Sequence, residues 1–458
     1  MSIAAEKIPL VDRISLKEKI GYSFGDAASN FYWKTFEFFL FFFYTDVFGI
    51  SAAAVGTMLL VTRLADAVAD PVMGAVADRT KTRWGHFRPY ILWFAVPLAV
   101  AGVLTFTTPN LSGGAKTVYA YITYSLLMFL YTAVNIPYTA LMGVMTPNSL
   151  ERTSLASIRF IGAFTVGVLV QYFTLTLVKL FGQGNQTRGW QLTMVLYGIL
   201  AAALLGLCFA STRERVAPPP RQKSNLGRDL RDLFTSRSWL ILVGVLLLIL
   251  AAFSVKGSVT LSYFKYFVKR EDLVAPFLVA NGLAFLAAVS LASYLAKWFG
   301  KKRLFMIAIG AGGLIIAGFW LARPSDISLM FALQIVSSFV IGFNSPLVFA
   351  MFADAADDAE WRTGRRTTGL VFASAIFATK AGWAIGGGIL GGVLDYFGYV
   401  PNQPQTARSL NGIMLSMSWI PCAMMLLATA LMQLYPLDEA LMVKIEADLK
   451  ARRGEVEA

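Results

Sequence analysis

The sequence STRERVAPPPRQKSNLGRDLRDLFTSRSW, residues 211–239, is the longest polar connection between the apolar runs of this chain. It holds three consecutive prolines, Pro218 to Pro220, and seven basic residues. Prolines and like charges of this density do not continue a helix through a membrane. Six apolar runs precede the connection and six follow it, so it divides the chain into two similar halves.

The composition indicates that the solvent of most of the chain is a lipid bilayer. Of 458 residues, 57% are hydrophobic and only 15% are charged, whereas soluble domains carry about a quarter charged residues. A span of about 20 apolar residues crosses the hydrocarbon layer as a helix, and these runs are too long for barrel strands. The predicted spans are 20–43, 53–76, 90–108, 117–142, 158–180, 190–211, 238–267, 275–298, 304–322, 327–352, 368–396 and 409–435.

The charge distribution predicts the orientation. The net charge of +13 comes mainly from basic residues on the side of the N-terminus, which places both termini in the cytoplasm and argues against a nucleic-acid partner. We expect an all-α multi-pass protein of the cell membrane that resembles the major facilitator layout. Its expected parts are a six-helix bundle at 1–211, a central loop at 212–237, a second bundle at 238–435 and a cytoplasmic tail at 436–458.

Several chemistries are excluded by what the sequence lacks. Cys208 and Cys422 lie in apolar runs and His86 is the only histidine, so neither a disulfide framework nor a metal centre is expected. The charged N-terminus does not fit a cleaved signal peptide. There is no Gly-rich phosphate loop for ATP. We therefore expect no enzyme activity and no cofactor.

Two carboxylates lie within the second predicted span. Asp66 and Asp70 are one helical turn apart, so both point in the same direction. Two desolvated like charges repel, and they need a proton, a cation or a basic neighbour such as Arg63. Two interpretations remain: a cation or proton site, and a salt-bridge cluster that holds helices together.

The first span carries a polar stripe. Asp26, Asn30, Lys34 and Glu37 follow helical spacings of four, four and three residues. Such a stripe is typical of a helix that lines a water-filled cavity. The alternative is an internal ion pair of Lys34 with Glu37 that only fixes helix register.

Further polar and aromatic residues are candidates for a substrate site. Four cations, Lys34, Arg159, Lys256 and Lys380, would together favour an anionic solute, unless some of them only neutralise the acids. Sugars stack on aromatic rings, although ordinary packing explains any single ring equally well. The remaining candidates in the spans are Tyr32, Trp33, Tyr131, Asn135, Tyr138, Asn344 and Trp383.

Two cytoplasmic segments have the composition of gates. Asp78, Arg79 and Arg83 follow the second span, and Asp354, Asp357 and Arg366 follow the tenth. Acids interleaved with bases could pair with helix ends in one conformation and release them in another. Anchoring by the positive-inside rule explains the bases but not the acids.

Several stretches resemble the glycoside–pentoside–hexuronide:cation symporters of the major facilitator superfamily, the family of melibiose permease and glucuronide permease. The resemblance covers nearly the whole chain. The stretches that carry it are YSFGDAASNF, YTDVFGIS, GTMLLVTRLADAVADPVMGAVADRTKTRWGHFRPY, YTAVNIPYTAL, ERTSLASIRF, FASTRERV and GYVPNQ.

The resemblance implies roles for particular residues. Asp66 and Asp70 correspond to the cation-site carboxylates, and we expect Asn30, Asp26 and Lys380 to belong to the same site. Arg159 and Lys380 correspond to residues at the sugar and cation-linked sites. Asn30 and Asn135 stand where the melibiose permease pattern has carboxylates. The loss of two negative charges argues against sodium coupling and brings the chain nearer the glucuronide permease branch.

Two aromatic positions of the melibiose permease pattern also differ. Its tryptophans are Thr139 and Ser345 in this chain, so a different surface for the sugar ring is implied.

From these observations we expect a secondary transporter that carries a sugar or glycoside together with H⁺ or Na⁺ by alternating access. An anionic uronide or sulfonated sugar is one such substrate. The alternative is a lipid or lysolipid carrier of the same superfamily. The expected partners are the sugar, the coupling cation and the lipid bilayer, and the expected state is a monomer.

Overall fold

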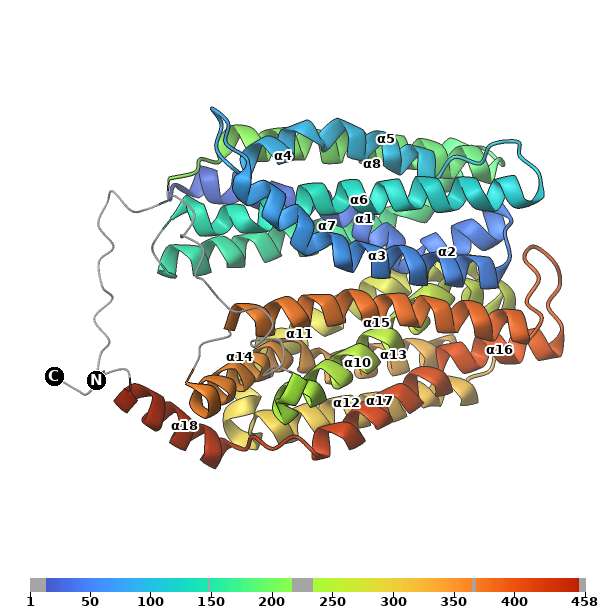
Figure 1. Cartoon of the computed structure of the whole chain (residues 1–458). Helices are drawn as coiled ribbons and strands as arrows, with labels where there is room; N and C mark the ends of the chain where they lie inside the picture. Colours follow the sequence, from blue (N-terminus) through green and yellow to red (C-terminus); the bar gives the residue numbers. More distant parts are fainter. Residues whose placement is uncertain (1–13, 147–148, 216–233, 365–367, 453–458) are drawn as a thin grey trace. The chain divides into compact units, whose positions relative to one another are not determined.

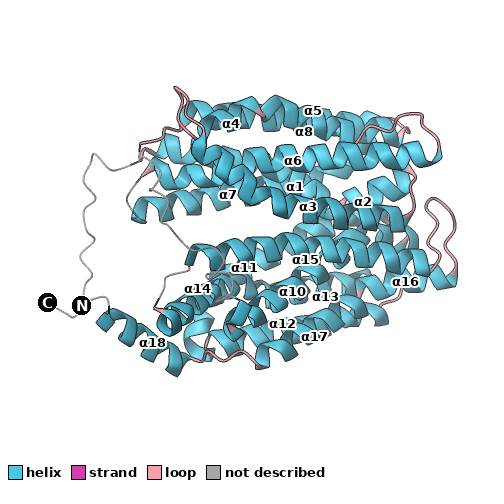
Figure 2. Cartoon of the chain, viewed as in Figure 1, coloured by secondary structure: helices cyan, strands magenta, loops and turns pink. Residues whose placement is uncertain are grey.

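The structure is a computed structural model that describes residues 14–146, 149–215, 234–364 and 368–452. Within these ranges the regular secondary structure is helical and there is no β-strand, as Figure 2 shows. The prediction of an all-α fold is therefore confirmed. The extended pairing between Thr82 and Gly85 is a single isolated bridge in a turn.

Each of the first six predicted spans coincides with helical structure (Figure 1). The third span is interrupted at Phe94 and the first ends in a π-helical turn, η2. The elements of this half are α1 (Leu16–Phe38), α2 (Leu40–Phe42), η2 (Phe43–Phe48), α3 (Ala52–Arg79), α4 (Arg88–Trp93), α5 (Ala95–Thr105), α6 (Gly113–Met145), α7 (Ser149–Gly182) and α8 (Gln186–Ser211).

The six spans of the second half are also confirmed as helices. The tenth and twelfth spans each consist of two helices, and a further helix, α18, lies in the predicted tail. The elements are α10 (Arg237–Ser262), η3 (Tyr263–Val268), η4 (Glu271–Leu273), α11 (Val274–Phe299), α12 (Lys301–Ala317), η5 (Gly318–Leu321), α13 (Ile327–Gly342), α14 (Asn344–Thr363), α15 (Thr368–Tyr396), α16 (Ala407–Met417), α17 (Trp419–Gln433) and α18 (Glu439–Arg452).

Ten helical stretches of the described residues are long and apolar enough to cross a membrane, and Ala95–Thr105 is a shorter apolar helix. α1 is not among the ten. The charges of Asp26, Lys34 and Glu37 reduce its hydropathy. The first span thus carries a polar stripe that departs from a lipid-facing composition.

Several helices begin at side chains that accept a hydrogen bond from the first turn. Ser15 Oγ accepts from Glu18 N at the start of α1, and Asn185 Oδ1 accepts from Arg188 N at the start of α8. Thr406 Oγ1 accepts from Ser409 N at the start of α16. These caps satisfy amide groups that have no partner inside the helix.

The chain divides into two compact units. Unit 1 comprises Met1–Phe43 and Ala65–Arg221, and unit 2 comprises Tyr44–Leu64 and Gln222–Ala458. In unit 1, α1 packs against α7 and α8, and α5 packs against α8. The predicted central loop lies mostly outside the described residues, so the domain boundaries at 211 and 238 stay predictions.

Unit 2 is built around α10. This helix packs against α15 and α17, while α11 packs against α13 and α12 against α17. Buried residues of α10, α14, α15, α17 and α18 form one apolar cluster, to which α18 contributes Met442, Ile445 and Leu449. The predicted tail therefore includes a helix that belongs to the core of this unit.

The packing of α1 on α6 depends on a glycine. A Cβ atom at Gly25 would lie 2.2 Å from the ring of Tyr138. That ring has no room to move, because it stacks on Tyr22 at 4.7 Å between centroids and its hydroxyl donates to Tyr22 O at 2.9 Å. Only glycine fits this contact.

We predict that Gly25→Ala destabilises unit 1 by about 1–3 kcal/mol, since overpacking forces side chains or backbone to shift. The measurement is the midpoint of thermal unfolding in detergent. The matched control is Gly206→Ala in α8, where a Cβ atom meets nothing within 4 Å. Equal midpoints for the two variants would contradict this packing argument.

Candidate functional site

Two of the carboxylates of α3, Asp66 and Asp70, share one hydroxyl group. Thr132 Oγ1 of α6 donates a hydrogen bond to Asp66 Oδ1 and lies 3.3 Å from Asp70 Oδ1. Asp66 is buried and Asp70 is half-buried. The predicted direction of both side chains is thus observed, and a polar group of a second helix lies between them.

An ion pair joins α1 to α7 in the same unit. Arg159 Nε lies 2.9 Å from Asp26 Oδ2, and its Nη2 lies 3.4 Å from Asp26 Oδ1. The guanidinium also lies over the ring of Tyr138 at 5.1 Å. Asn30 Nδ2 donates to the carbonyl of Asp26 at 2.9 Å, one turn away on α1.

The rest of the stripe on α1 is also paired. Lys34 Nζ lies 2.6 Å from Glu37 Oε2, which is the internal pair that the sequence left open as an alternative. Trp33 of α1 stacks on Tyr131 of α6 with ring centroids 6.3 Å apart.

Tyr131 connects these groups. Its side chain shares a hydrogen bond with Asn135 and lies near the charges of Asp26, Asp66 and Arg159. Unit 1 therefore brings together most of the residues predicted for it. Thr139, which was also predicted for the site, lies instead on an exposed part of α6.

The other predicted residues belong to unit 2. Trp383 of α15 is buried, its ring lies 5.7 Å from the guanidinium of Arg63, and its carbonyl accepts a hydrogen bond from Ser254 Oγ. Lys380 is half-buried on the same helix, and Asn344 is buried at the start of α14. The Oδ1 atom of Asn344 has no hydrogen-bond partner among the described residues.

A further polar network of unit 2 surrounds Lys256. Its Nζ atom donates to Gln334 Oε1 of α13, and it lies over the rings of Phe277 and Phe319 at 5.8 and 5.1 Å. Gln334 Nε2 in turn donates to Asn281 Oδ1 of α11 at 2.6 Å. Within the described residues, Lys256 takes part in no ion pair with an acid.

Thr132, Gln334 and Asn281 were not predicted from the sequence. Thr132 lies one turn before Asn135 on the same face of α6, so helical spacing from a candidate residue could have found it. Gln334 and Asn281 carry no charge, and each gives little signal in an apolar run.

The predicted gating residues are described only in part. Arg366 and the side chain of Asp78 lie outside the described residues, and Arg79 is exposed. The guanidinium of Arg83 lies over the Trp84 ring at 4.6 Å. Asp354 of α14 forms an ion pair with Lys301 of α12, and Asp357 is half-buried. The role of these residues as a gate stays a prediction.

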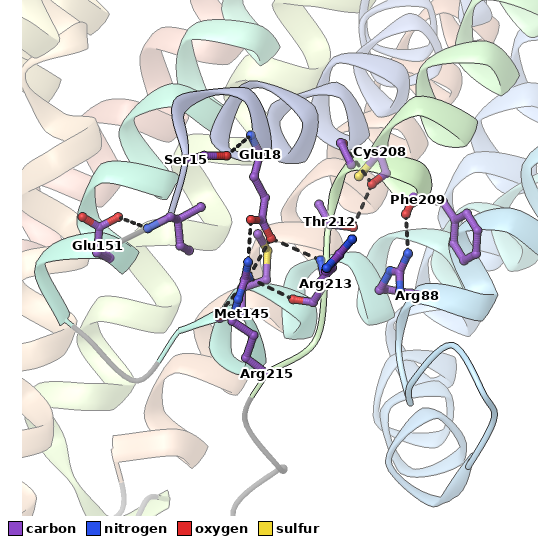
Figure 3. A network of polar contacts seen from close by, with 12 residues as sticks. Ser15, Glu18, Arg88, Met145, Glu151, Cys208, Phe209, Thr212, Arg213 and Arg215 are labelled. Atoms are coloured by element: carbon purple, nitrogen blue, oxygen red, sulfur yellow. Dashed lines mark hydrogen bonds and ion pairs between the residues drawn. The ribbon is translucent and has the colours of Figure 1, made fainter. Parts of the chain in front are cut away.

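The cytoplasmic end of unit 1, in the predicted orientation, contains a polar network that was not predicted from the sequence (Figure 3). Glu18 of α1 accepts from Arg215 Nη1 at 2.7 Å and Nη2 at 2.8 Å, and from Arg213 N at 3.2 Å. Arg215 N donates to Val144 O of α6. The hydrogen bonds to Glu18 raise the pKa of Arg215. A two-pronged pair of this kind fixes the ends of α1, α6 and α8 together.

Glu214, next to this network, holds the turn before α4. Its carboxylate accepts from His86 N, Phe87 N and Arg88 N at 2.8, 2.8 and 2.9 Å. Arg88 Nη2 donates to Phe209 O at 2.6 Å, as Figure 3 shows. The stretch FASTRERV, recognised in the sequence only by resemblance, therefore anchors the connection between the second and third spans.

The fold and the polar interior together define a class, the multi-pass helical membrane proteins of the major facilitator fold. A solved bacterial homologue of the human lysosomal transporter Spinster, in an inward-facing and unoccupied conformation, matches with a TM-score of 0.69 at 12% identity, covering 95% of this chain and 97% of its own. At this identity the match shows the fold alone.

The sequence comparisons identify the family. The model of the family described as MFS/sugar transport protein matches residues 21–439. An inner membrane symporter of Escherichia coli, YicJ, is 38% identical, with 92% of each chain covered. The glucuronide carrier protein homolog of the same organism is 34% identical over 96% of this chain and 97% of its own.

The chain belongs to this family of sugar transport proteins. The resemblance to the glycoside–pentoside–hexuronide:cation symporters is confirmed.

We predict that Glu214→Ala frees the turn before α4, because three amide groups lose a charged acceptor. Hydrogen bonds to charged groups contribute about 1.5–3 kcal/mol each when buried, and less where water replaces them. Limited digestion with trypsin should cut faster at Lys81 and Arg83. The control is Asp395→Ala, which removes an exposed acid of α15. Equal cleavage rates in both variants would show that Glu214 does not hold this turn.

Proposed function

We propose that the chain is a secondary transporter that carries a sugar or glycoside together with H⁺ or Na⁺. In this proposal two bundles, 1–211 and 238–435, alternately open a central path to either side of the membrane. Membership in a sugar transport family and the name of the symporter relative support it. Neither the family nor these relatives favour the lipid-carrier alternative.

The observation that carries the proposal is the group formed by Asp66, Thr132 and Asp70. Two carboxylates of adjacent turns share one hydroxyl donor inside a membrane span. Binding of a proton or of a sodium ion there reduces the repulsion between the acids. If neutralisation of Asp66 and Asp70 favours the conformation that binds the sugar, binding of the cation raises the affinity for the sugar. By linkage, binding of the sugar raises the affinity for the cation by the same factor.

The polar groups around Tyr131 supply what a sugar requires. Trp33 and Tyr131 offer ring faces, and Asn135 and Asn30 offer amide groups that both donate and accept hydrogen bonds. The Asp26–Arg159 pair adds a charged acceptor and donor. We assign the sugar-binding role to these residues of α1, α6 and α7, together with Lys380 and Trp383 of α15.

One observation favours an anionic sugar. Lys34 and Arg159 each pair with an acid of unit 1, so these two cations are already neutralised. Lys256 has an amide and two aromatic rings around its ammonium group. A carboxylate or sulfonate on the sugar would supply the missing counter-ion, and the name of the glucuronide carrier relative is in keeping with this chemistry.

The remaining features of the proposal come from the sequence. Both termini lie in the cytoplasm, as the distribution of basic residues predicts. The transporter acts as a monomer, with the coupling ion in place of a cofactor and no catalytic step.

We predict that Asp66→Asn or Asp70→Asn abolishes sugar-driven cation uptake by proteoliposomes, since an amide does not carry the charge that the cation neutralises. Asp272→Asn changes an exposed acid on an outer turn and should leave uptake unchanged. If sugar-driven cation uptake survives in both Asp66→Asn and Asp70→Asn, the assignment of these two residues as the cation site is contradicted.

A milder variant separates cation binding from folding. Thr132→Val should raise the cation concentration for half-maximal uptake by roughly tenfold, as expected for a lost hydrogen bond to a charged group. The matched change, Thr123→Val, removes a hydroxyl on the same helix that bonds only to carbonyls of its own turn. An equal effect of both changes would point to packing of α6 and not to the cation.

We predict that Lys256→Met reduces uptake of uronates or sulfonated sugars by roughly tenfold or more and leaves neutral glycosides less affected. The measurement is proteoliposome uptake of a panel of both kinds under separate sodium and pH gradients. Lys297→Met, at the exposed end of α11, is the control. Uptake of neutral sugars only by the unchanged protein would refute the anionic substrate.

A further inference from the structure

A series of uncharged polar groups surrounds one cation inside unit 2. Lys256 Nζ of α10 donates to Gln334 Oε1 of α13, and Gln334 Nε2 donates to Asn281 Oδ1 of α11 at 2.6 Å. Ser338, one turn after Gln334, accepts from Gln334 Nε2 at 3.0 Å and donates to Asn281 Oδ1 at 2.6 Å. Gln334 and Ser338 are buried, whereas Lys256 and Asn281 are half-buried. The middle of the network is thus enclosed and its two ends are partly accessible.

The three helices place these groups at a similar depth. Lys256 lies six residues before the end of α10, and Gln334 and Asn281 each lie seven residues after the start of their helices. At the rise of an α-helix this is roughly 9 to 11 Å from each helix end. In the predicted orientation all three ends are the outer ones, so the network lies within the outer half of the hydrocarbon layer.

The ammonium group fixes the direction of both amides in the network. Because an ammonium has hydrogen-bond donors only, Gln334 must turn its carbonyl oxygen toward Lys256. Its amide nitrogen then faces Asn281 and Ser338, and both of its hydrogens are used there. Asn281 Oδ1 accepts from two donors, so Asn281 presents its oxygen to the network. Rotation of either amide would place two donors against each other.

The network holds Lys256 without neutralising it. In the part of the chain that the structure describes, the acceptor of its ammonium group is an amide oxygen, and no acid forms an ion pair with it. The buried rings of Phe277 and Phe319 lie 5.8 and 5.1 Å from Nζ. Ring faces attract a cation, but less strongly than a carboxylate in direct contact. A positive charge therefore remains for an anion to compensate.

Packing of the helices does not require a cation at this position. α11 packs against α13, and the hydrogen bonds among Asn281, Gln334 and Ser338 join these two helices without Lys256. α10 packs mainly against α15 and α17. The long side chain of Lys256 thus reaches from one group of helices to another, where an uncharged donor would complete the same hydrogen bond. The charge is the property that packing leaves unexplained.

We propose that Lys256 is the anion-binding group of a subsite in unit 2, and that Gln334 is the positioning residue that leaves its charge available. The ligand is a carboxylate or sulfonate carried on a sugar. This inference rests on the proposed function and adds the residue that decides the charge of the substrate. A glutamine orients the ammonium group as a glutamate would, but it does not neutralise it. Asn281 and Ser338 hold the glutamine in the orientation that this role requires.

Two changes at position 334 have different expected effects on selectivity. Gln334→Glu keeps the size of the side chain and adds a carboxylate next to Lys256. The ratio of uptake of an anionic sugar to uptake of its neutral counterpart should then fall roughly tenfold or more. Gln334→Met removes the acceptor and adds no charge, so this ratio should stay at or above that of the unchanged protein. A residue that only packs would lower the uptake of both sugars in both variants.

The measurement is proteoliposome uptake of uronides, each compared with the neutral sugar that has a hydroxymethyl group in place of the carboxylate. Gln433→Glu is the control, because it makes the same change at an exposed position of α17. Its uptake ratio should stay within about twofold of the unchanged protein. Asn281→Asp is a second acidic variant if Gln334→Glu does not reach the membrane. Its charge lies one residue further along the network, so the ratio should fall to a smaller extent.

A second measurement needs no sugar. The midpoint of thermal unfolding in detergent is compared in sodium methanesulfonate and in sodium chloride at equal concentration. An oxyanion that binds the folded protein raises this midpoint. The difference between the two salts should be present in the unchanged protein and in Gln334→Met, and it should be lost in Gln334→Glu.

Equal uptake ratios in the unchanged protein and both Gln334 variants, or an equal fall in both variants, would overturn the subsite and leave the proposed symport standing. Where no sugar is carried, equal midpoint differences in the three proteins would overturn it. A midpoint difference that Gln334→Glu alone loses, without uptake of any sugar, would support the subsite and remove the proposed sugar symport.

Discussion

Ionised side chains in the hydrocarbon layer cost several kcal/mol unless a partner or water compensates them. In the described part of the chain, acid–base pairs within each unit meet part of this cost. Asp26 pairs with Arg159, and Asp46 pairs with Lys265. Because each pair joins residues far apart in the sequence, the same contacts that neutralise charge also fix which helices are neighbours.

This constraint limits which charges remain for transport. The stripe on α1 looks like a row of four polar groups, yet its Lys34 and Glu37 satisfy each other and its Asp26 is held by α7. Asn30 and Asn135 are amides, and each bonds to a neighbour within one turn of its own helix. Among the residues that we assign to the site, the negative charge that could bind a cation is therefore concentrated on α3, at Asp66 and Asp70.

The fold could be predicted from the sequence because a membrane span is a local property. About 20 apolar residues are needed wherever the span lies, so each run could be recognised by itself. The spacing of Asp66 and Asp70 is local in the same sense, and it correctly predicted side chains that share a direction. The π-helical ends of the first and seventh spans and the helix in the predicted tail were not recognised, since their residues are apolar or mixed and do not change the hydropathy pattern.

The partners of these residues could not be predicted in the same way. Thr132 is 66 residues from Asp66, and Tyr399 is 353 residues from Asp46, so helical periodicity carries no information about either contact. Aromatic side chains were assigned to sugar stacking by chemistry alone, whereas the ring of Trp383 lies against the guanidinium of Arg63. A pattern on one helix shows which face is polar, and only the packing of several helices shows what that face meets.

The ion pair of Asp46 with Lys265 joins two segments of unit 2 that are far apart in the sequence. Both residues lie in a six-residue π-helical turn that ends the first span of its half, FYTDVF in one and YFKYFV in the other. Like charges at these two positions would repel, because the side chains lie 2.8 Å apart. An acid on one turn and a base on the other make the same contact an ion pair. The aromatic residues of the two turns then exclude water and strengthen it. The opposite charges of the two turns therefore stabilise a contact between segments that lie 219 residues apart in the sequence.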